Sequence, residues 1–401
     1  MKHKRSCSDI ISDLPQNIIE TILCLVPIRD AVRTSVLSKK WRYNWTQIPK
    51  LEFDDYDMLD EEENEDYTER GRLKSKRKLL KRKRKLFRAI KHVLLMHSDS
   101  ILECSLSIRD GNNKCVEIDQ IIACLSRMNT VKKLRLILNA DVISTYELPS
   151  SIFSFCQLNN LYLGNCILDH QPTTFNGFGQ LKSLDLDCVI TSKELILDVV
   201  SKSPLLKKFS MINHEYFNPV FNRAFMCELF GYMPAIEELF LGSHYGYFRQ
   251  FDSSLPKIST PLVHLKYAHL HEPFFMGDGL PFVVHLIRSS PNMEKLTLEC
   301  INDPEKTLGI DSLTATEYSD IWLDHLKVLE LHLDDVIHDM EFLKLIFARS
   351  PMLKVVNIHF NYRLENFSEW KKDDETEMLR VVSNTPQASH TVKIGVQHDE
   401  D

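Results

Sequence analysis

A short strand motif recurs along this chain and constrains its fold more than any other feature. The motif is x-L-x-x-L-x-L, in which two apolar residues flank one residue that belongs to the opposite face. Successive copies begin 23 to 33 residues apart. One short strand per unit at this period is typical of leucine-rich repeats. We assign the inward-facing pairs to Cys104/Leu106, Leu134/Leu136, Leu161/Leu163, Leu184/Leu186, Phe209/Met211, Leu239/Leu241, Leu265/Tyr267, Leu296/Leu298, Leu329/Leu331 and Val356/Ile358.

Helical patterns alternate with these strands. Apolar residues recur at helical spacing in 191–200, 281–289 and 340–350, and several repeats share a Ser-Pro lead-in such as Ser203-Pro204. A strand cannot cover its two inward residues alone, so neighbouring repeats must stack. The sequence therefore predicts an α/β fold over residues 86–320, a leucine-rich-repeat solenoid with a curved parallel sheet and helices on its convex side.

The residue between each inward pair should face the concave side, because side chains alternate across a strand. The predicted central row mixes two bases, two acids and two aromatic residues, which favours a protein partner over a phosphate-rich polymer. Tyr162 and Phe240 are the expected anchors, since buried aromatic residues often dominate interfaces. The row comprises Arg135, Tyr162, Asp185, Ser210, Phe240, Lys266, Thr297, Glu330 and Asn357. Of these, we select Arg135, Tyr162, Asp185, Phe240, Lys266 and Glu330 as candidate substrate-binding residues.

The N-terminal residues 9–50 predict three short helices. Pro15 is suited to the start of the first helix, which carries apolar residues at helical spacing through Leu25. Pro27 ends that helix, and Asp30 suits the first turn of the second. Ser38 can cap a third helix that holds Trp41 and Trp45. So small a module is marginal alone, and it usually keeps apolar surface for a partner.

The amino-acid sequence of this segment resembles that of a known domain. Leu14-Pro15, the isoleucines, the run Ile28 to Ser38 (IRDAVRTSVLS) and Lys40-Trp41-Arg42 resemble an F-box, specifically that of the plant F-box/FBD/LRR-repeat proteins. The resemblance implies docking on a Skp-type adaptor. The alternative is an ordinary three-helix subdomain that has no partner. The matching apolar positions, and hence the candidate adaptor-binding residues, are Leu14, Pro15, Ile18, Ile22, Leu23, Leu37 and Trp41.

A charge inversion follows in the segment that we interpret as a linker, residues 51–85. Residues 54–69 hold ten acids and no base, whereas residues 70–91 hold thirteen bases and no acid, including Lys81 to Lys85. Blocks of like charge resist packing, so we expect the acidic half to be disordered. The basic half should become a helix with an apolar side. It is a nuclear-localisation signal, a patch for an acidic partner, or a solvated linker.

Residues 321–401 resemble the FBD unit that ends the same plant family. We expect a strand at 354–360, a helix at 376–383 and a closing strand at 391–396. A terminal unit of this kind would cap the exposed end of the repeat core.

Catalytic motifs are not found in the sequence, and we expect no enzyme activity, cofactor or metal site. We interpret His269 and His271 as ordinary surface or loop residues, and Gly277-Asp278-Gly279 as a turn. The ten cysteines are scattered, which suits reduced thiols in the nucleus or cytoplasm. A start without an apolar leader and the lack of a membrane-length apolar run predict a soluble intracellular protein.

The resemblance implies the function of a substrate-recognition subunit in an SCF-type, cullin-based ubiquitin ligase. Its partners would be the Skp-type adaptor, the cullin scaffold and an unknown target protein. The alternative is a repeat scaffold without ubiquitin chemistry. A third hypothesis is a nucleic-acid-associated protein that uses residues 70–91, although the net charge of -7 argues against a general nucleic-acid binder. The aromatic residues Tyr245, Tyr247, Phe248 and Phe251 are either further partner anchors or cover for a weak repeat.

Overall fold

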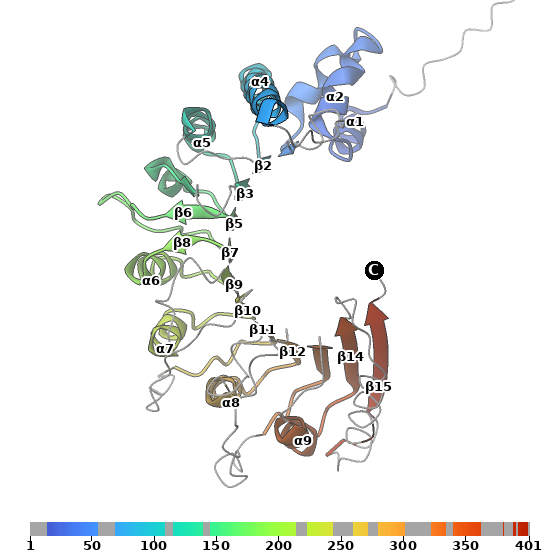
Figure 1. Cartoon of the computed structure of the whole chain (residues 1–401), viewed down its shortest axis with the longest axis vertical. Coiled ribbons are helices and arrows are strands. Elements are labelled where there is room, and N and C mark those ends of the chain that lie inside the picture. Colours follow the sequence, from blue (N-terminus) through green and yellow to red (C-terminus); the bar gives the residue numbers. More distant parts are fainter. Residues whose placement is uncertain are drawn as a thin grey trace, which may run out of the picture. The chain divides into compact units, whose positions relative to one another are not determined.

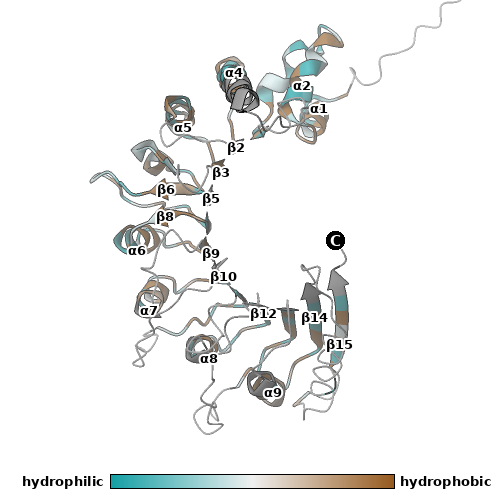
Figure 2. Cartoon of the chain, viewed as in Figure 1, coloured by the Kyte–Doolittle hydropathy of each residue, from teal (hydrophilic) through white to brown (hydrophobic). Residues whose placement is uncertain are grey.

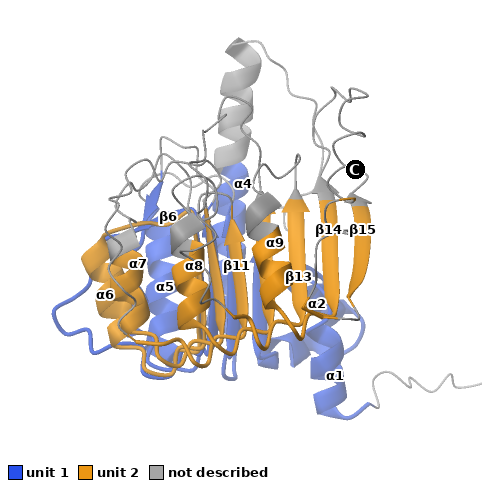
Figure 3. Cartoon of the chain, turned by 90° about the horizontal axis from the view of Figure 1, so that it is seen from below, with its two compact units in different colours: residues 1–180 blue, residues 181–401 orange. Residues whose placement is uncertain are grey.

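The computed structural model describes most of the chain and divides it into two compact units, residues 1–180 and 181–401 (Figure 3). Both units consist of parallel strands and helices. The described residues are 14–54, 69–108, 115–138, 145–213, 223–243, 260–271, 280–300, 322–333, 340–361, 380, 388–389 and 392–399.

The first unit begins with the predicted helical module, whose third helix differs from the expectation. Pro15 and Pro27 directly precede α1 and α2, and their carbonyls accept the first helical N–H bonds. Ser38 Oγ accepts a bond from the Trp41 N–H at 3.4 Å. This cap precedes a 3-10 helix rather than an α-helix. The helices are α1 (Gln16–Leu23), α2 (Ile28–Arg33), η1 (Thr34–Val36) and η2 (Trp41–Gln47).

Four parallel strands in the order β1-β2-β3-β5 form the sheet of the first unit. Helix α4 lies between β1 and β2 in the sequence, and α5 lies between β2 and β3. A second pair, β4 and β6, is also parallel. The elements are β1 (Lys50–Asp54), α4 (Glu69–Met96), β2 (Glu103–Ile108), α5 (Val116–Met128), β3 (Lys133–Leu138), β4 (Tyr146–Glu147), η3 (Ser150–Ser154), β5 (Asn160–Gly164) and β6 (Cys166–Leu168).

The second unit holds eight sheet strands in the order β7-β9-β10-β11-β12-β13-β14-β15. Its helices lie on one side of this sheet (Figure 1). The predicted helices at 191–200, 281–289 and 340–350 correspond to α6, α8 and α9. The elements are β7 (Ser183–Asp187), β8 (Ile190–Thr191), α6 (Lys193–Ser201), β9 (Lys208–Asn213), α7 (Arg223–Gly231), β10 (Glu238–Ser243), β11 (Tyr267–His271), α8 (Leu280–Ser289), β12 (Lys295–Cys300), β13 (Val328–Leu333), α9 (Met340–Arg349), β14 (Val355–Asn361) and β15 (Lys393–Asp399).

A repeated backbone connection joins neighbouring repeats just before each strand. The Lys207 carbonyl accepts N–H bonds from Glu237 and Glu238 at 2.7 and 2.9 Å. The equivalent carbonyls of the repeats that follow accept the same two bonds from the next repeat. Each repeat thus positions the first residue of the next strand, which keeps the strands in register. These further carbonyls belong to Glu237, Lys266, Glu294 and Lys327.

The predicted inward pairs are buried in every repeat except the one at Leu265/Tyr267. There Leu265 is buried, but the Tyr267 side chain is 41% exposed. The strand instead turns Ala268 and Leu270 inward, so His269 occupies the central position that we assigned to Lys266. The prediction was wrong because alanine is a weak hydrophobic signal, and Leu265 in the lead-in took its place in the pattern.

The start of the expected charged linker is part of the sheet. Residues 51–54 lie in β1, which pairs with β2 so that Leu51 is opposite Cys104 and Phe53 is opposite Leu106. Both Leu51 and Phe53 are fully buried. Their alternation with acidic neighbours is that of a strand with one buried face. The basic half, including Lys81 to Lys85, lies on α4.

At the C-terminal end, β14 and β15 occupy the two expected strand positions and pair in parallel. The expected helix at 376–383 lies outside the described residues, except for helical residue 380.

Candidate functional site

The helical module at the N-terminus divides its apolar side chains between a core and the surface. On α1, Ile19 and Leu23 are buried, whereas Ile18 and Ile22 are 41% and 40% exposed. The members of each pair share a helix face because they have i,i+4 spacing, and the two faces are about 100° apart around the helix. Brown, hydrophobic segments are visible on this module in Figure 2. The large apolar residues exposed on it are Ile18, Ile22, Leu25, Val26, Val36, Leu37 and Tyr43.

The structure separates the predicted adaptor-binding residues into two groups. Ile18, Ile22 and Leu37 are exposed, as is Pro15, and Leu14 is half-buried. Leu23 and Trp41 are 1% and 5% exposed, so they belong to the core of the module and cannot contact a partner directly.

The sequence analysis missed two of the most exposed apolar residues. Leu25 is 82% exposed in the turn before Pro27, and Val36 is 87% exposed in η1. Both residues follow the end of an α-helix, and this was the signal in the sequence. An apolar residue beyond a helix end no longer belongs to the buried apolar stripe of that helix.

Hydrogen bonds join this module to the first repeat. The Ser98 N–H donates to the Thr46 carbonyl at 2.9 Å, and His97 Nε2 lies 2.9 Å from the Ile48 carbonyl oxygen. The Pro49 carbonyl accepts the N–H groups of Leu102 and Glu103. The end of α4 and the start of β2 therefore hold η2 and β1 in place.

The sheet face of the second unit, opposite its helices, carries the other candidate site. Strand register places Asp185, Ser210, Phe240, His269, Thr297, Glu330 and Asn357 in one row across β7 to β14. The predicted row is thus reproduced with His269 in place of Lys266. In the first unit, Arg135 and Tyr162 are register neighbours on β3 and β5.

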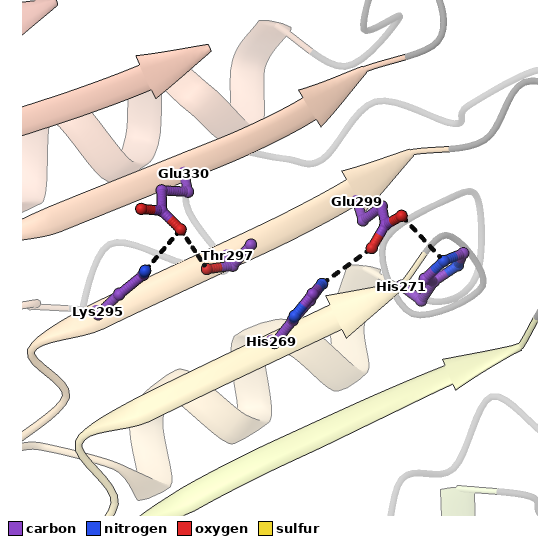
Figure 4. Close-up of polar contacts among 6 residues, drawn as sticks. All are labelled: His269, His271, Lys295, Thr297, Glu299 and Glu330. Carbon is purple, nitrogen blue, oxygen red and sulfur yellow. Dashed lines mark hydrogen bonds and ion pairs between the residues drawn. The ribbon is translucent and has the colours of Figure 1, made fainter. Parts of the chain in front are cut away.

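Two hydrogen-bonded clusters dominate this face between β11 and β13 (Figure 4). In the first, Glu299 accepts from His269 Nε2 at 3.0 Å and lies 3.3 Å from His271 Nε2. In the second, Glu330 lies 2.6 Å from Lys295 Nζ and accepts a bond from Thr297 at 3.2 Å. The residues of each cluster come from different repeats, so the strand register brings them together.

The clusters determine the charge state of their carboxylates. Hydrogen bonds from His269 and His271 hold the pKa of Glu299 well below its usual range, against the opposing effect of burial. For Glu330, burial raises the pKa, but the Lys295 and Thr297 bonds and nearby positive charge leave it lowered. Both side chains are therefore carboxylates at neutral pH. Lys295 compensates the charge of Glu330 within the sheet face, and the two histidines hold Glu299 through hydrogen bonds.

Aromatic rings also lie on this face. Phe240 is half-buried, with Lys208 Nζ 5.1 Å from its ring centroid and the His269 ring centroid at 5.6 Å. His332 and His359 stack with centroids 4.4 Å apart. In the first unit, the Arg135 guanidinium lies 3.7 Å from the Tyr162 ring centroid. Each predicted aromatic anchor thus has a cation beside it, which orients the ring.

Reactive chemistry is not apparent in the part of the chain that the structure describes. No group of three or more His, Cys, Asp or Glu side chains among these residues could hold a metal ion. At the one candidate cluster, the His269 and His271 Nε2 atoms face the Glu299 oxygens themselves. Burial raises the pKa of the Cys104 thiol to about 12, so it packs as a small hydrophobic side chain.

None of the described helices has the length and hydrophobicity that crossing a bilayer requires. The sequence positions Tyr245 to Phe251 and Gly277 to Gly279 lie outside the described residues.

Comparison with known proteins gives two family matches. The F-box domain matches residues 11–52, and the family described as "FBD-associated F-box protein At5g56370, LRR repeats" matches residues 119–243. The F-box/FBD/LRR-repeat protein At1g13570 of Arabidopsis thaliana is 27% identical over 430 aligned positions, which cover 95% of this chain and 97% of that protein. The chain thus matches an F-box domain and a repeat family of FBD-associated F-box proteins, and over nearly its whole length it is similar to an F-box/FBD/LRR-repeat protein.

Other relatives of this chain match over shorter stretches. The Arabidopsis FBD-associated F-box protein At5g56370 is 33% identical over 214 residues, which cover 51% of this chain and 43% of that protein. Identity reaches 60% over 47 residues, 12% of each chain, in the putative Arabidopsis F-box/FBD/LRR-repeat protein At5g52460. A solved leucine-rich repeat-containing protein from Legionella pneumophila covers 74% of this chain at 16% identity, with a TM-score of 0.36 and 83% of its own chain covered.

F-box domains generally bind Skp-type adaptors. Similarity to F-box/LRR proteins generally indicates a non-catalytic, substrate-adaptor role.

Proposed function

We propose that this chain is the substrate-recognition subunit of an SCF-type, cullin-based ubiquitin ligase. The observation that carries the proposal is the outward apolar surface of the F-box, with Ile18, Ile22 and Leu37 exposed while a separate set of side chains fills its core. A surface of this kind is suited to a protein partner. The Skp-type adaptor would dock here, and the cullin would join through the adaptor.

The repeats would bind the target protein on the helix-free sheet face. Arg135 and Tyr162 would contribute from the first unit, and Asp185, Phe240, His269 and Glu330 from the second. Lys266 is withdrawn from the proposed contact residues because His269 occupies its place in the row. Mixed polar contacts around two partly buried rings suit a folded protein surface. Ubiquitin transfer would then follow from proximity, with no reacting side chain in this chain.

Co-purification tests the adaptor half of the proposal. The full chain, co-expressed with a Skp-type adaptor and a cullin, should recover both through a tag on this chain. A Leu14→Ala/Pro15→Ala variant should lose both partners and keep its thermal unfolding transition. If the wild-type chain folds but recovers neither protein, the alternative of a scaffold without ubiquitin chemistry is favoured.

We propose a nuclear or cytoplasmic location, or both. The support is the basic run at 81–85, which lies on α4 with exposed or half-buried side chains. Replacing its five bases by glutamine in a fluorescent fusion should move the protein out of the nucleus. An unchanged distribution would reject the run as a localisation signal.

A further inference from the structure

Helix α4 carries a stripe of four cations on one face, and the structure gives them no role in the fold. Lys81, Arg84, Lys85 and Arg88 are exposed and follow i, i+3, i+4, i+7 spacing, so they share one helix face. We call this set the basic stripe. The opposite face is buried and apolar, through Leu86, Phe87, Ile90, Val93 and Leu94.

The four cations are not matched by anions within the described chain. Other bases nearby are engaged: Lys91 Nζ, for example, donates to Gln120 Oε1 of α5 at 2.6 Å. No hydrogen bond or ion pair of the described residues involves a basic-stripe side chain. The sequence continues the same charge, because residues 70–80 add six bases and no acid.

The composition of this face distinguishes between possible partners. A stable contact with an acidic protein surface requires apolar or aromatic anchors, because exposed ion pairs contribute little by themselves. From Lys81 to His92, the fully exposed side chains are all basic or histidine; the nearest exposed apolar residue is Leu95. A phosphate backbone, in contrast, is bound by cations alone, with counterion release as the driving force.

The dimensions fit a phosphate backbone as well. From Lys81 to Arg88 the helix advances about 10 Å, at about 1.5 Å per residue. One strand of a duplex presents a phosphate about every 3.4 Å along its axis, so the stripe spans about three such intervals, which join about four phosphates of one strand.

We propose that the exposed face of α4 is a sequence-independent binding surface for the phosphate backbone of a nucleic-acid duplex. The net charge of -7 argued against such binding only as an average over the chain. The basic stripe concentrates one sign of charge on a single face. This surface uses none of the apolar F-box residues or sheet-face residues of the proposed function, so its occupation does not depend on the proposed ligase function.

The test uses the full chain and a labelled 20-base-pair DNA duplex of arbitrary sequence, with binding followed by fluorescence anisotropy from 50 to 200 mM salt. The slope of the logarithm of the binding constant against the logarithm of salt concentration has a magnitude of about 0.9 per phosphate contact, so four lost contacts reduce it by about 3.6. Between 50 and 200 mM salt, these four contacts alone account for an affinity loss of about a hundredfold. The variant Lys81→Gln/Arg84→Gln/Lys85→Gln/Arg88→Gln should therefore bind the duplex more weakly and with a slope lower by about three to four.

A matched control separates the stripe from net charge. The variant Lys132→Gln/Lys182→Gln/Lys266→Gln/Lys354→Gln removes four exposed bases scattered over the repeats and should leave both affinity and slope close to wild type. Circular dichroism should show that both variants keep their helix content.

Three results would overturn the proposal. The first is a wild-type chain that does not bind the duplex at 50 mM salt. The second is a control variant that loses as much affinity as the α4 variant. The third is a poly-glutamate peptide that displaces the duplex at equal charge concentration, because an acidic protein segment would then be the better occupant.

Discussion

The F-box and the sheet face of the second unit expose opposite kinds of surface. On the F-box, the apolar side chains of Leu25, Val36 and Leu37 are between 69% and 87% exposed. On the sheet face, charged groups such as Glu299 and Lys295 are paired with residues of neighbouring strands. An apolar surface binds by area, whereas a paired polar surface gains affinity only when a partner matches its groups. The difference suits one constant partner for the F-box and one selected partner for the repeats.

The largest effects are expected where an F-box residue belongs to the core instead of the surface. Leu23→Ala should destabilise the F-box by about 2–5 kcal/mol, because it removes a fully buried side chain. Ile18→Ala should cost much less, since its side chain is 41% exposed. Chemical denaturation of each variant measures both values, and equal losses would contradict this separation of core and surface.

The corrected strand register predicts the next largest contrast. Leu265→Ala should cost about 2–5 kcal/mol, because Leu265 is fully buried in the lead-in to β11. Tyr267→Ala should change stability by less than about 1 kcal/mol, since the ring is exposed. If the two costs were reversed, Tyr267 would point inward as the sequence pattern first indicated.

A smaller effect, on binding alone, is expected at Phe240. Phe240→Ala should weaken target capture by about 2 kcal/mol, or about thirtyfold, if the ring is a central anchor. Adaptor binding and thermal stability should stay near wild type. Tyr162→Ala provides the same comparison in the first unit. If both variants unfold, the rings belong to the core; if both keep full capture, the target binds elsewhere.

The smallest effect concerns pH. Burial, and the nearby His359, lower the pKa of His332. The folded state therefore binds a proton at His332 less readily than the unfolded state, in which the histidine pKa is about 6.5. The resulting stability is fully present above pH 6.5 and is lost as the pH falls through the lower pKa of the folded state. The charges of Glu299 and Glu330 oppose this lowering of the pKa, whereas His269 adds to it.

Replacing His332 by asparagine should reduce the loss of melting temperature between pH 7.5 and 5.5. The matched control is His264→Asn, an exposed position in the same unit. An unchanged pH profile in the His332 variant would exclude His332 as a source of acid sensitivity.

Periodicity in the sequence predicted most of the repeat fold, because two buried residues per strand leave a strong signal. It failed at Ala268, where a small side chain fills an inward position. It also missed β1, because Leu51 and Phe53 lie at the edge of an acidic run. The pairing of Glu299 with His269 could not be predicted, since it depends on which residues of different repeats are opposite one another.

The F-box shows the same limit within a single helix. Helical spacing identified the apolar residues of α1, but two faces satisfied it, and only packing shows which one is buried. Leu23 and Trp41 were therefore grouped with Ile18 and Ile22 as contact residues. Family resemblance cannot separate the groups either, because core and contact positions both match.

Adaptor affinity of two charge-matched α1 variants tests the central claim most directly. Ile18→Asp/Ile22→Asp places two carboxylates on the outward apolar face, while Asn17→Asp/Thr21→Asp adds the same charge at exposed polar positions of the same helix. Calorimetric titration of a purified Skp-type adaptor into each full-length variant should show binding abolished in the first and largely retained in the second, with similar melting temperatures. Adaptor binding retained by the Ile18/Ile22 variant would contradict the assignment of this face as the docking surface.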